Sequence, residues 1–170
     1  MCLRGASEVQ RAVLDRLPGQ RLHAFVVWLP MMQHDEESQV PQAMRAISDA
    51  RVTHFWDGAR ELSKAYSPIL GLEYDLHTVD RALIFRWLLH VQLRLQGGPR
   101  FQPAWDVYLV FNRRAQWGET PPTPDFWMHQ LRVSETHRLK GERLAAAVRQ
   151  HLSTDEASPR TAASFHQPLS

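Results

Sequence analysis

The chain has a single cysteine, Cys2, and this residue offers the clearest route to covalent chemistry. A thiol at the start of a helix lies near the positive end of the helix dipole, which lowers its pKa and raises its thiolate fraction. Arg4 would add to that effect. Disulfide exchange also needs a second cysteine to release the mixed disulfide, and this sequence has none. The other interpretation is an unreactive thiol at a frayed chain end, and both stay open.

Two groups of polar residues follow predicted strands and could meet at one edge of a sheet. His34 stands next to the acidic residues 35–37, and His54 lies three residues before Asp57. Open α/β sheets commonly bind ligands at the carboxyl ends of their strands. Neither group has the i, i+4 histidine pair of a zinc-binding helix. We therefore predict no metal site, and we expect His129 to be a packed, hydrogen-bonded residue.

Six tryptophans are many for a chain of this length. Trp28, Trp56 and Trp105 lie in or beside predicted strands, where packing is their ordinary role. Trp117 and Trp127 flank a proline-rich segment and are predicted to pack it against the sheet. An aromatic wall for a ligand is the alternative. No glycine-rich loop opens a helix, so the sequence predicts no phosphate-containing cofactor, and no other cofactor is predicted.

Length and composition suit one globular domain of 170 residues with an ordinary core. Hydrophobic residues make up 44% of the chain and charged residues 22%. The 20 basic side chains are nearly matched by 18 acidic ones, giving a net charge of only +2. No basic stripe suited to a phosphate backbone results, so nucleic acid is not an expected partner. A lone cysteine also excludes an internal disulfide and a cysteine-rich zinc site.

The hydrophobic pattern predicts helices and strands in alternation. The nearly continuous apolar run 23–29 is typical of a strand that is covered on both faces. Further strands are expected at 51–56 and 105–111, and the latter is predicted to enter a hairpin turn at 112–114 with a returning strand at 115–118. Helices are expected at 7–17, 39–48, 58–66, 125–131 and 134–152.

An unusually long helix is predicted at about 75–96, ending at Gly97-Gly98-Pro99. Its apolar residues recur at helical spacing on one face. Charged residues, including Arg86 and Arg94, interrupt the stretch, and arginine is costly in the centre of a bilayer. We therefore expect a soluble helix that could offer a face to a partner, and no membrane insertion.

Four segments are similar to a group of uncharacterised bacterial thioredoxin-like proteins. The matching strings are VVWLPMM at 26–32, RVTHFWD at 51–57, AWDVYLVF at 104–111 and PPTPDFWMHQL at 121–131. The resemblance covers roughly residues 2–131 and leaves out about 73–102, which we interpret as an insertion. It implies an α/β, thioredoxin-like fold that lacks its first strand and the first cysteine of the Cys-x-x-Cys motif. Cys2 then takes the position of the second, resolving cysteine.

The resemblance implies an organisation and two candidate functions. We expect a thioredoxin-like domain over 1–132 with its helical insertion at 73–102, a C-terminal helix over 133–152, and a disordered tail over 153–170. The first function is that of a relative of the thiol–disulfide oxidoreductases, not redox-competent as given, with Cys2 as catalytic residue and a protein thiol or disulfide as partner. The alternative is a non-catalytic protein-binding module on the same scaffold.

The absence of a central strand has a consequence for association. Such a gap leaves backbone groups and apolar residues such as those at 25–29 uncovered, so the chain is predicted to self-associate. Residues 1–10 contain charged Arg4 and Glu8 and no apolar core of a signal peptide. We therefore expect a cytoplasmic protein, an expectation that lapses if the true start lies upstream.

Overall fold

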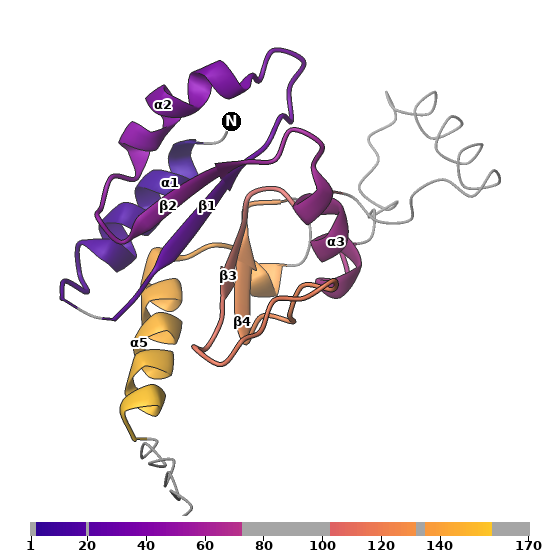
Figure 1. Cartoon of the computed structure of the whole chain (residues 1–170). Coiled ribbons are helices and arrows are strands. Elements are labelled where there is room, and N and C mark those ends of the chain that lie inside the picture. The colour runs from indigo at the N-terminus through magenta and orange to yellow at the C-terminus, as the bar shows by residue number, and fades with distance from the viewer. Residues whose placement is uncertain (1–2, 20, 73–102, 132–134, 158–170) are drawn as a thin grey trace, which may run out of the picture.

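A computed structural model of the chain describes residues 3–19, 21–72, 103–131 and 135–157. In these residues the chain is a mixed α/β structure with four α-helices and two small sheets (Figure 1). The elements in chain order are α1 (Leu3–Val9) with a π-helical turn η1 (Gln10–Leu14), β1 (Ala24–Trp28), the 3-10 turn η2 (Glu37–Gln39), α2 (Val40–Ala43), the 3-10 turn η3 (Met44–Ala46), β2 (Val52–Trp56), α3 (Glu61–Ile69), β3 (Val107–Val110), β4 (Phe126–His129), the 3-10 turn η6 (Glu135–His137) and α5 (Gly141–Ala157).

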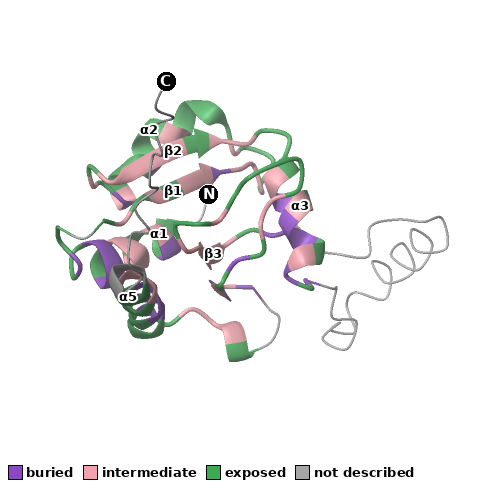
Figure 2. Ribbon diagram, turned by 60° about the horizontal axis from the view of Figure 1, so that its bottom comes forward, coloured by how far each residue is buried: buried purple, intermediate pink, exposed green. Residues whose placement is uncertain are grey.

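Each sheet consists of two strands. β1 and β2 are parallel, with Ala24 opposite Val52 and Trp28 opposite Trp56. β3 and β4 are antiparallel and adjacent in sequence order. Figures 1 and 2 both show β1 lying between β2 and β3. Within the described residues no strand joins the two sheets.

Helix α1 and the turn η1 hold the two sheets together from one side. One buried cluster joins them to β1 and α2, through Leu14, Trp28, Ala43 and Ile47. Another joins them to β4 and α5, through Val13, Leu17, Met128, Leu144, Ala145 and Val148. Val9 and Leu22 pack against both clusters. The burial of apolar surface along this one helical segment therefore bridges two sheets that share no backbone hydrogen bonds.

Helix α3 covers the other face of β3 and β4. Its cluster contains Tyr66, Leu70, Leu72, Ala104 and Leu131. Val107 and Leu109 pack against that cluster, whereas Tyr108 and Val110 face α1 and α5, as the two-residue period of a strand requires. Figure 2 shows buried segments on both α3 and α5. The sheet β3–β4 is thus covered on both faces.

Two glycines allow close approaches to α1. A Cβ atom on Gly5, which is buried, would lie 1.5 Å from the hydroxyl oxygen of Tyr108 in β3. A Cβ atom on Gly141, at the start of α5, would lie 2.0 Å from a carboxylate oxygen of Glu8 and 2.6 Å from the Cβ of Ala12. A side chain at either position would push the contacting elements apart.

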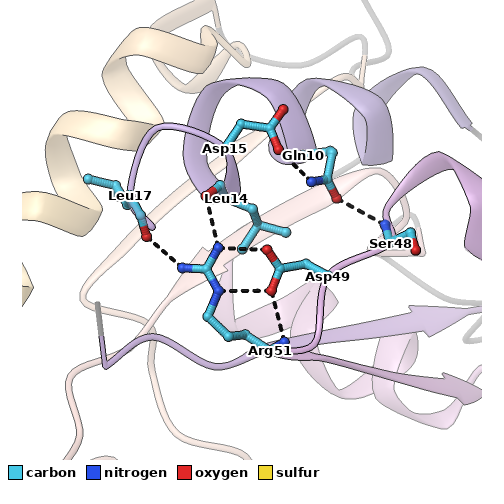
Figure 3. A network of polar contacts seen from close by, with 7 residues as sticks. All are labelled: Gln10, Leu14, Asp15, Leu17, Ser48, Asp49 and Arg51. Carbon is cyan, nitrogen blue, oxygen red and sulfur yellow. Dashed lines mark hydrogen bonds and ion pairs between the residues drawn. The ribbon is translucent and has the colours of Figure 1, made fainter. Parts of the chain in front are cut away.

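Arg51, the residue before β2, forms hydrogen bonds with the end of the first helical segment, which consists of α1 and η1 (Figure 3). Its guanidinium donates hydrogen bonds to the carbonyl oxygens of Leu14 at 2.8 Å and Leu17 at 2.5 Å. Carbonyls at a helix C-terminus have no partner within the helix, so an arginine is a suitable donor for them. Gly19, with φ of +73°, then turns the chain toward β1.

The hairpin predicted after β3 is wrong. Residues 115–118 form no strand, and the strand that pairs with β3 is β4, inside the segment 125–131 that was predicted to be helical. Phe126 and Met128 face α1 and α5, while Trp127 faces α3. Successive residues that pack on opposite faces fit a strand and not a helix. The loop between the strands is closed by Asp125, whose carboxylate accepts the Asn112 backbone N–H at 2.8 Å.

The other predicted elements are found with shifted ends. The strands expected at 23–29, 51–56 and 105–111 are confirmed as β1, β2 and β3. The helix expected at 39–48 is broken into η2, α2 and η3, and α5 continues beyond its expected end to Ala157. The insertion 73–102 and residues 158–170 of the expected tail lie outside the described residues. Among the helices described, none is long and apolar enough to cross a membrane.

Candidate functional site

The predicted catalytic residue, Cys2, lies outside the described residues. The first residue of α1 is Leu3, so the cysteine immediately precedes this helix in the sequence. Arg4, which was expected to favour the thiolate, is exposed. The role of Cys2 therefore stays a prediction.

His54 is held by its neighbour on the adjacent strand and is not a free acid or base. The indole Nε1–H of Trp28 donates to His54 Nδ1 at 3.2 Å, and the two rings are stacked with centroids 6.1 Å apart. Partial burial lowers the pKa of His54. An Nδ1 atom that accepts a hydrogen bond belongs to a neutral ring, so both observations indicate a structural, uncharged histidine.

The carboxylates at the same sheet edge are also structural. Asp57 accepts the backbone N–H groups of Glu61 and Leu62 at 3.0 and 2.9 Å, which caps the start of α3. Asp35 accepts those of Met31 and Met32 at 3.0 and 2.8 Å and fixes the turn after β1. In the described part of the chain no three histidine, cysteine or acidic side chains are grouped to hold a metal ion.

Two histidines pack around Trp127. His129 is fully buried, and its Nδ1 accepts the backbone N–H of Leu131 at 3.1 Å, as expected for a packed residue. The ring of His137 is stacked on the Trp127 indole with centroids 4.2 Å apart, and its Nδ1 lies 3.2 Å from the Trp127 carbonyl oxygen. These contacts hold the segment after β4 against the sheet.

A shallow groove of about 440 Å³ lies between the loop after β3 and the end of α5. It is lined by Asn112, Arg114, Ala115, Thr123, Asp125, Gln150, His151 and Thr154. Its acidic side chain is already engaged, because both Asp125 oxygens hold the Asn112 amide at 2.9 and 3.0 Å. His151 Nδ1 bonds to the Ala147 carbonyl at 2.8 Å. The groove has no nucleophile with an adjacent base.

The sheet β1–β2 has one face that carries exposed aromatic side chains. Phe25 is 65% exposed and Phe55 is 49% exposed, and their ring centroids lie 6.1 Å apart. His23 lies against Phe25 at 4.7 Å and bonds to the Thr53 hydroxyl at 2.9 Å. The opposite face, with Trp28, packs under α2 and η1. We call the surface formed by His23, Phe25, Thr53 and Phe55 the aromatic face.

Comparison with known proteins supplies no relative for this chain. No model of a protein family matches it, and neither a curated protein sequence nor a solved structure does.

The sequence did not predict the aromatic face. The run 23–29 was expected to be covered on both sides, and this expectation is wrong at Phe25. A buried strand and a strand with one open apolar face have the same composition, so periodicity could not separate them. The polar residues His23 and Thr53, which stand two residues before Phe25 and Phe55 and therefore on the same face, were a signal that this face is open.

Proposed function

We propose that the chain is a thioredoxin-like domain that functions as a protein-binding module. The observation that carries this function is the aromatic face, where two phenylalanines on adjacent strands are exposed side by side. The fold assignment draws on the order of elements. Helix, strand, helix, strand, helix, two antiparallel strands and a closing helix is the order expected of a thioredoxin-like domain after its first strand.

Exposed phenylalanines that are diagonal neighbours on adjacent strands indicate a contact surface. Single apolar residues are common on protein surfaces, but adjacent aromatic rings on one flat face are typical of sites that bind another protein. Aromatic side chains are enriched at such interfaces because they bury a large area with little loss of side-chain entropy. His23 and Thr53 border the pair with groups that can hydrogen bond. The partner we expect is therefore an apolar segment of another polypeptide.

Selection from a displayed peptide library tests this function. Peptides selected on the chain should lose binding by tenfold or more when Phe25→Ser and Phe55→Ser are combined, a loss of about 1.4 kcal/mol or more. Met32→Ser is the matched control, because Met32 is 63% exposed outside the aromatic face. Peptides that bind equally well to the double variant and to the control would contradict the proposal.

The predicted self-association suggests a second copy of the chain as the other candidate to bind the aromatic face. Sedimentation velocity over a wide range of concentrations measures it directly. A concentration-dependent dimer that disappears in the Phe25→Ser, Phe55→Ser variant would place the second copy on the aromatic face. A monomer at every concentration would contradict self-association and leave the polypeptide partner as the occupant.

Thiol–disulfide exchange at Cys2 is the second candidate function. It is favoured by the start of α1 at Leu3, directly after the cysteine in sequence. The Cys2 thiolate would attack one sulfur of a partner disulfide, form a mixed disulfide and release the other sulfur as a thiolate. Because the chain has no second cysteine, the reaction would stop at this stoichiometric adduct.

The rate of reaction with a small aromatic disulfide tests the second candidate. Cys2 should react faster at neutral pH than the cysteine of a short peptide with the same sequence, and Cys2→Ser should abolish the adduct. A rate equal to that of the peptide, with the same dependence on pH, would show an ordinary thiol.

A further inference from the structure

The inner face of the β1–β2 sheet, opposite the aromatic face, is covered by a segment with little regular structure of its own. This segment, residues 37–47, contains η2, α2 and η3, which are three, four and three residues long. Isolated helices of such lengths are unstable in water, so the segment keeps its shape through its contacts with the sheet and with α1–η1. We call residues 37–47 the cover segment (Figure 1).

Few apolar side chains attach the cover segment to the rest of the chain. Ala43 and Ile47 are buried in the cluster that also contains Trp28 and Leu14, and Val40 packs against this cluster. The turns η2 and η3 contribute no buried residue. Regions with few buried apolar contacts open at a lower cost in free energy than the core of a fold. The cover segment is therefore suited to open while β3, β4 and α5 remain packed.

His54 lies on this inner face, at the end of the cover segment. Val52 and Trp56, two residues before and after it in β2, pack against the same cluster, so the three side chains share one face. The Trp28 indole N–H donates to His54 Nδ1 at 3.2 Å. A hydrogen bond to the backbone of Ile47 favours the protonated ring, so it runs from the ring to the carbonyl. The neutral ring thus accepts from β1 and donates to the cover segment.

A proton on Nδ1 would change this arrangement. Both ring nitrogens of His54 would then be donors, and the Trp28 N–H would face a donor in place of an acceptor. The indole has little room to turn away, because Trp28 is buried against Ala43 and Ile47. The charged ring also needs water or an acidic partner. Water can reach it if the cover segment, which contacts it through Ile47, moves aside.

The titratable side chains of the surrounding elements do not supply an acidic partner for the charged ring. Burial and the bond to Ile47 are the causes that shift the pKa of His54, and no charged neighbour in the described part of the chain is among them. The ionisable residues of α1–η1, of the cover segment and of the loops that follow them are exposed or engaged with other groups: Arg4, Glu8, Arg11, Asp15, Glu37, Arg45, Asp49 and Arg51.

We propose that the cover segment is an acid-sensitive element, which opens from the inner face of β1–β2 when His54 takes up a proton, while the rest of the fold stays packed. Opening would uncover Trp28 and Val26, which now pack in or against the buried cluster. The chain would then present a second apolar surface in acidic surroundings. The proposal is independent of the protein-binding function, because the aromatic face lies on the opposite side of the same sheet.

Amide hydrogen exchange of the full chain at pH 7 and pH 5 tests the proposal. The amides of Met44, Ile47 and Ser48 are hydrogen-bonded in the closed segment. Their protection, corrected for the intrinsic exchange rate at each pH, should fall by about five- to thirtyfold. The upper limit is the ratio of protonated to neutral imidazole for an exposed histidine at pH 5. The Leu144 amide, which donates to the Lys140 carbonyl in α5 at 3.0 Å, should keep its protection.

Two variants and a second readout identify the group responsible. His54→Asn retains an acceptor for the Trp28 indole but takes up no proton, so protection of the cover segment should be equal at both pH values. His23→Asn is the matched control, because it makes the same substitution on the opposite face of the sheet, and it should retain the fall. In the unchanged chain, nitrogen NMR should show His54 Nδ1 gaining its proton over the pH range in which the Ile47 amide loses protection.

Three results would overturn the proposal. Equal loss of protection in the cover segment and at Leu144 would show that acid unfolds the whole chain. A loss that persists in His54→Asn would assign the sensitivity to another group. Unchanged protection while His54 takes up its proton would show that the charged ring is accommodated without opening. None of these results bears on the peptide selection that tests the aromatic face.

Discussion

The Asp49 carboxylate forms two hydrogen bonds with the Arg51 guanidinium, at 2.8 Å to Nε and 2.7 Å to Nη2. The two side chains are about one fifth exposed, at 19% and 20%. The hydrogen bonds from Arg51 lower the pKa of Asp49 to about 2. Because Asp49 fixes the plane of the guanidinium, its remaining donors are directed at the carbonyls that end the first helical segment (Figure 3).

Replacement of Arg51 tests whether this network fastens the first helical segment to β2. Arg51→Ala removes the partners of two main-chain carbonyls, and we expect the free energy of unfolding to fall by about 1–3 kcal/mol. Arg51→Lys retains the charge but not the planar fork, so it should recover less than half of the loss. Urea unfolding of the three proteins provides the values. Full recovery by lysine would show that charge alone matters.

The pairing of Trp28 with His54 predicts a dependence of stability on pH. Burial lowers the pKa of His54 in the folded chain below its usual 6.5, so the unfolded chain binds the proton more readily. The contribution of the neutral His54 ring to the free energy of unfolding is fully present above pH 6.5. It is lost as the pH falls from 6.5 toward the lower pKa of the folded chain. His54→Asn keeps an acceptor for the indole but does not titrate. Its free energy of unfolding should therefore fall less than that of the unchanged chain between pH 7 and pH 5, and equal slopes would contradict the assignment.

Tyr66 should remain un-ionised when an exposed tyrosine has lost its proton. Burial raises its pKa to about 12, and its hydroxyl donates to the Pro122 carbonyl at 3.1 Å. A raised folded-state pKa gives stability that is present below the unfolded-state pKa near 10 and is lost as the pH rises through about 12. Ultraviolet absorbance of the phenolate should show a late transition that Tyr66→Phe removes. Titration of all tyrosines near pH 10 would show that this side chain is accessible.

The contact of Gly5 with Tyr108 predicts a substitution that should be partly rescued. Gly5→Ala places a Cβ atom in the space of the Tyr108 hydroxyl, and overpacking of this kind typically costs about 1–3 kcal/mol. Tyr108→Phe removes the oxygen and should recover part of the loss in the double variant, as a double-mutant cycle would measure. Ser7→Ala, at an exposed position of the same helix, is the control. Strict additivity of the two substitutions would contradict direct contact.

The strands of the fold could be predicted where valine and aromatic residues are concentrated in the sequence. β1, β2 and β3 each consist of four or five residues rich in valine and aromatic side chains, and all three were found. β4 was missed because Phe126, Trp127 and Met128 form a run too short to separate a strand from a helix by period. β4 is a strand because β3 supplies its backbone partners. Its alternate residues pack against two layers, α1 with α5 on one face and α3 on the other.

The candidate site could be predicted less well than the fold. Sequence alone directs attention to residues with reactive groups, such as Cys2, His54 and Asp57. In the structure His54 and Asp57 are engaged with neighbouring groups, and the surface that remains open is formed by Phe25 and Phe55. Exposure of an apolar residue depends on which helix lies above its strand, and that is a property of tertiary packing.

Amide hydrogen exchange of the chain alone tests most directly that, among the described residues, no backbone hydrogen bonds join β1 to β3. The account predicts alternation along each strand. Val26 and Trp28 in β1, and Tyr108 and Val110 in β3, should exchange slowly, whereas the odd-numbered Phe25, Val27, Val107 and Leu109 should exchange quickly. Slow exchange at both odd and even positions, in a monomer, would show that both edges of each strand are paired and would contradict the arrangement as two separate sheets.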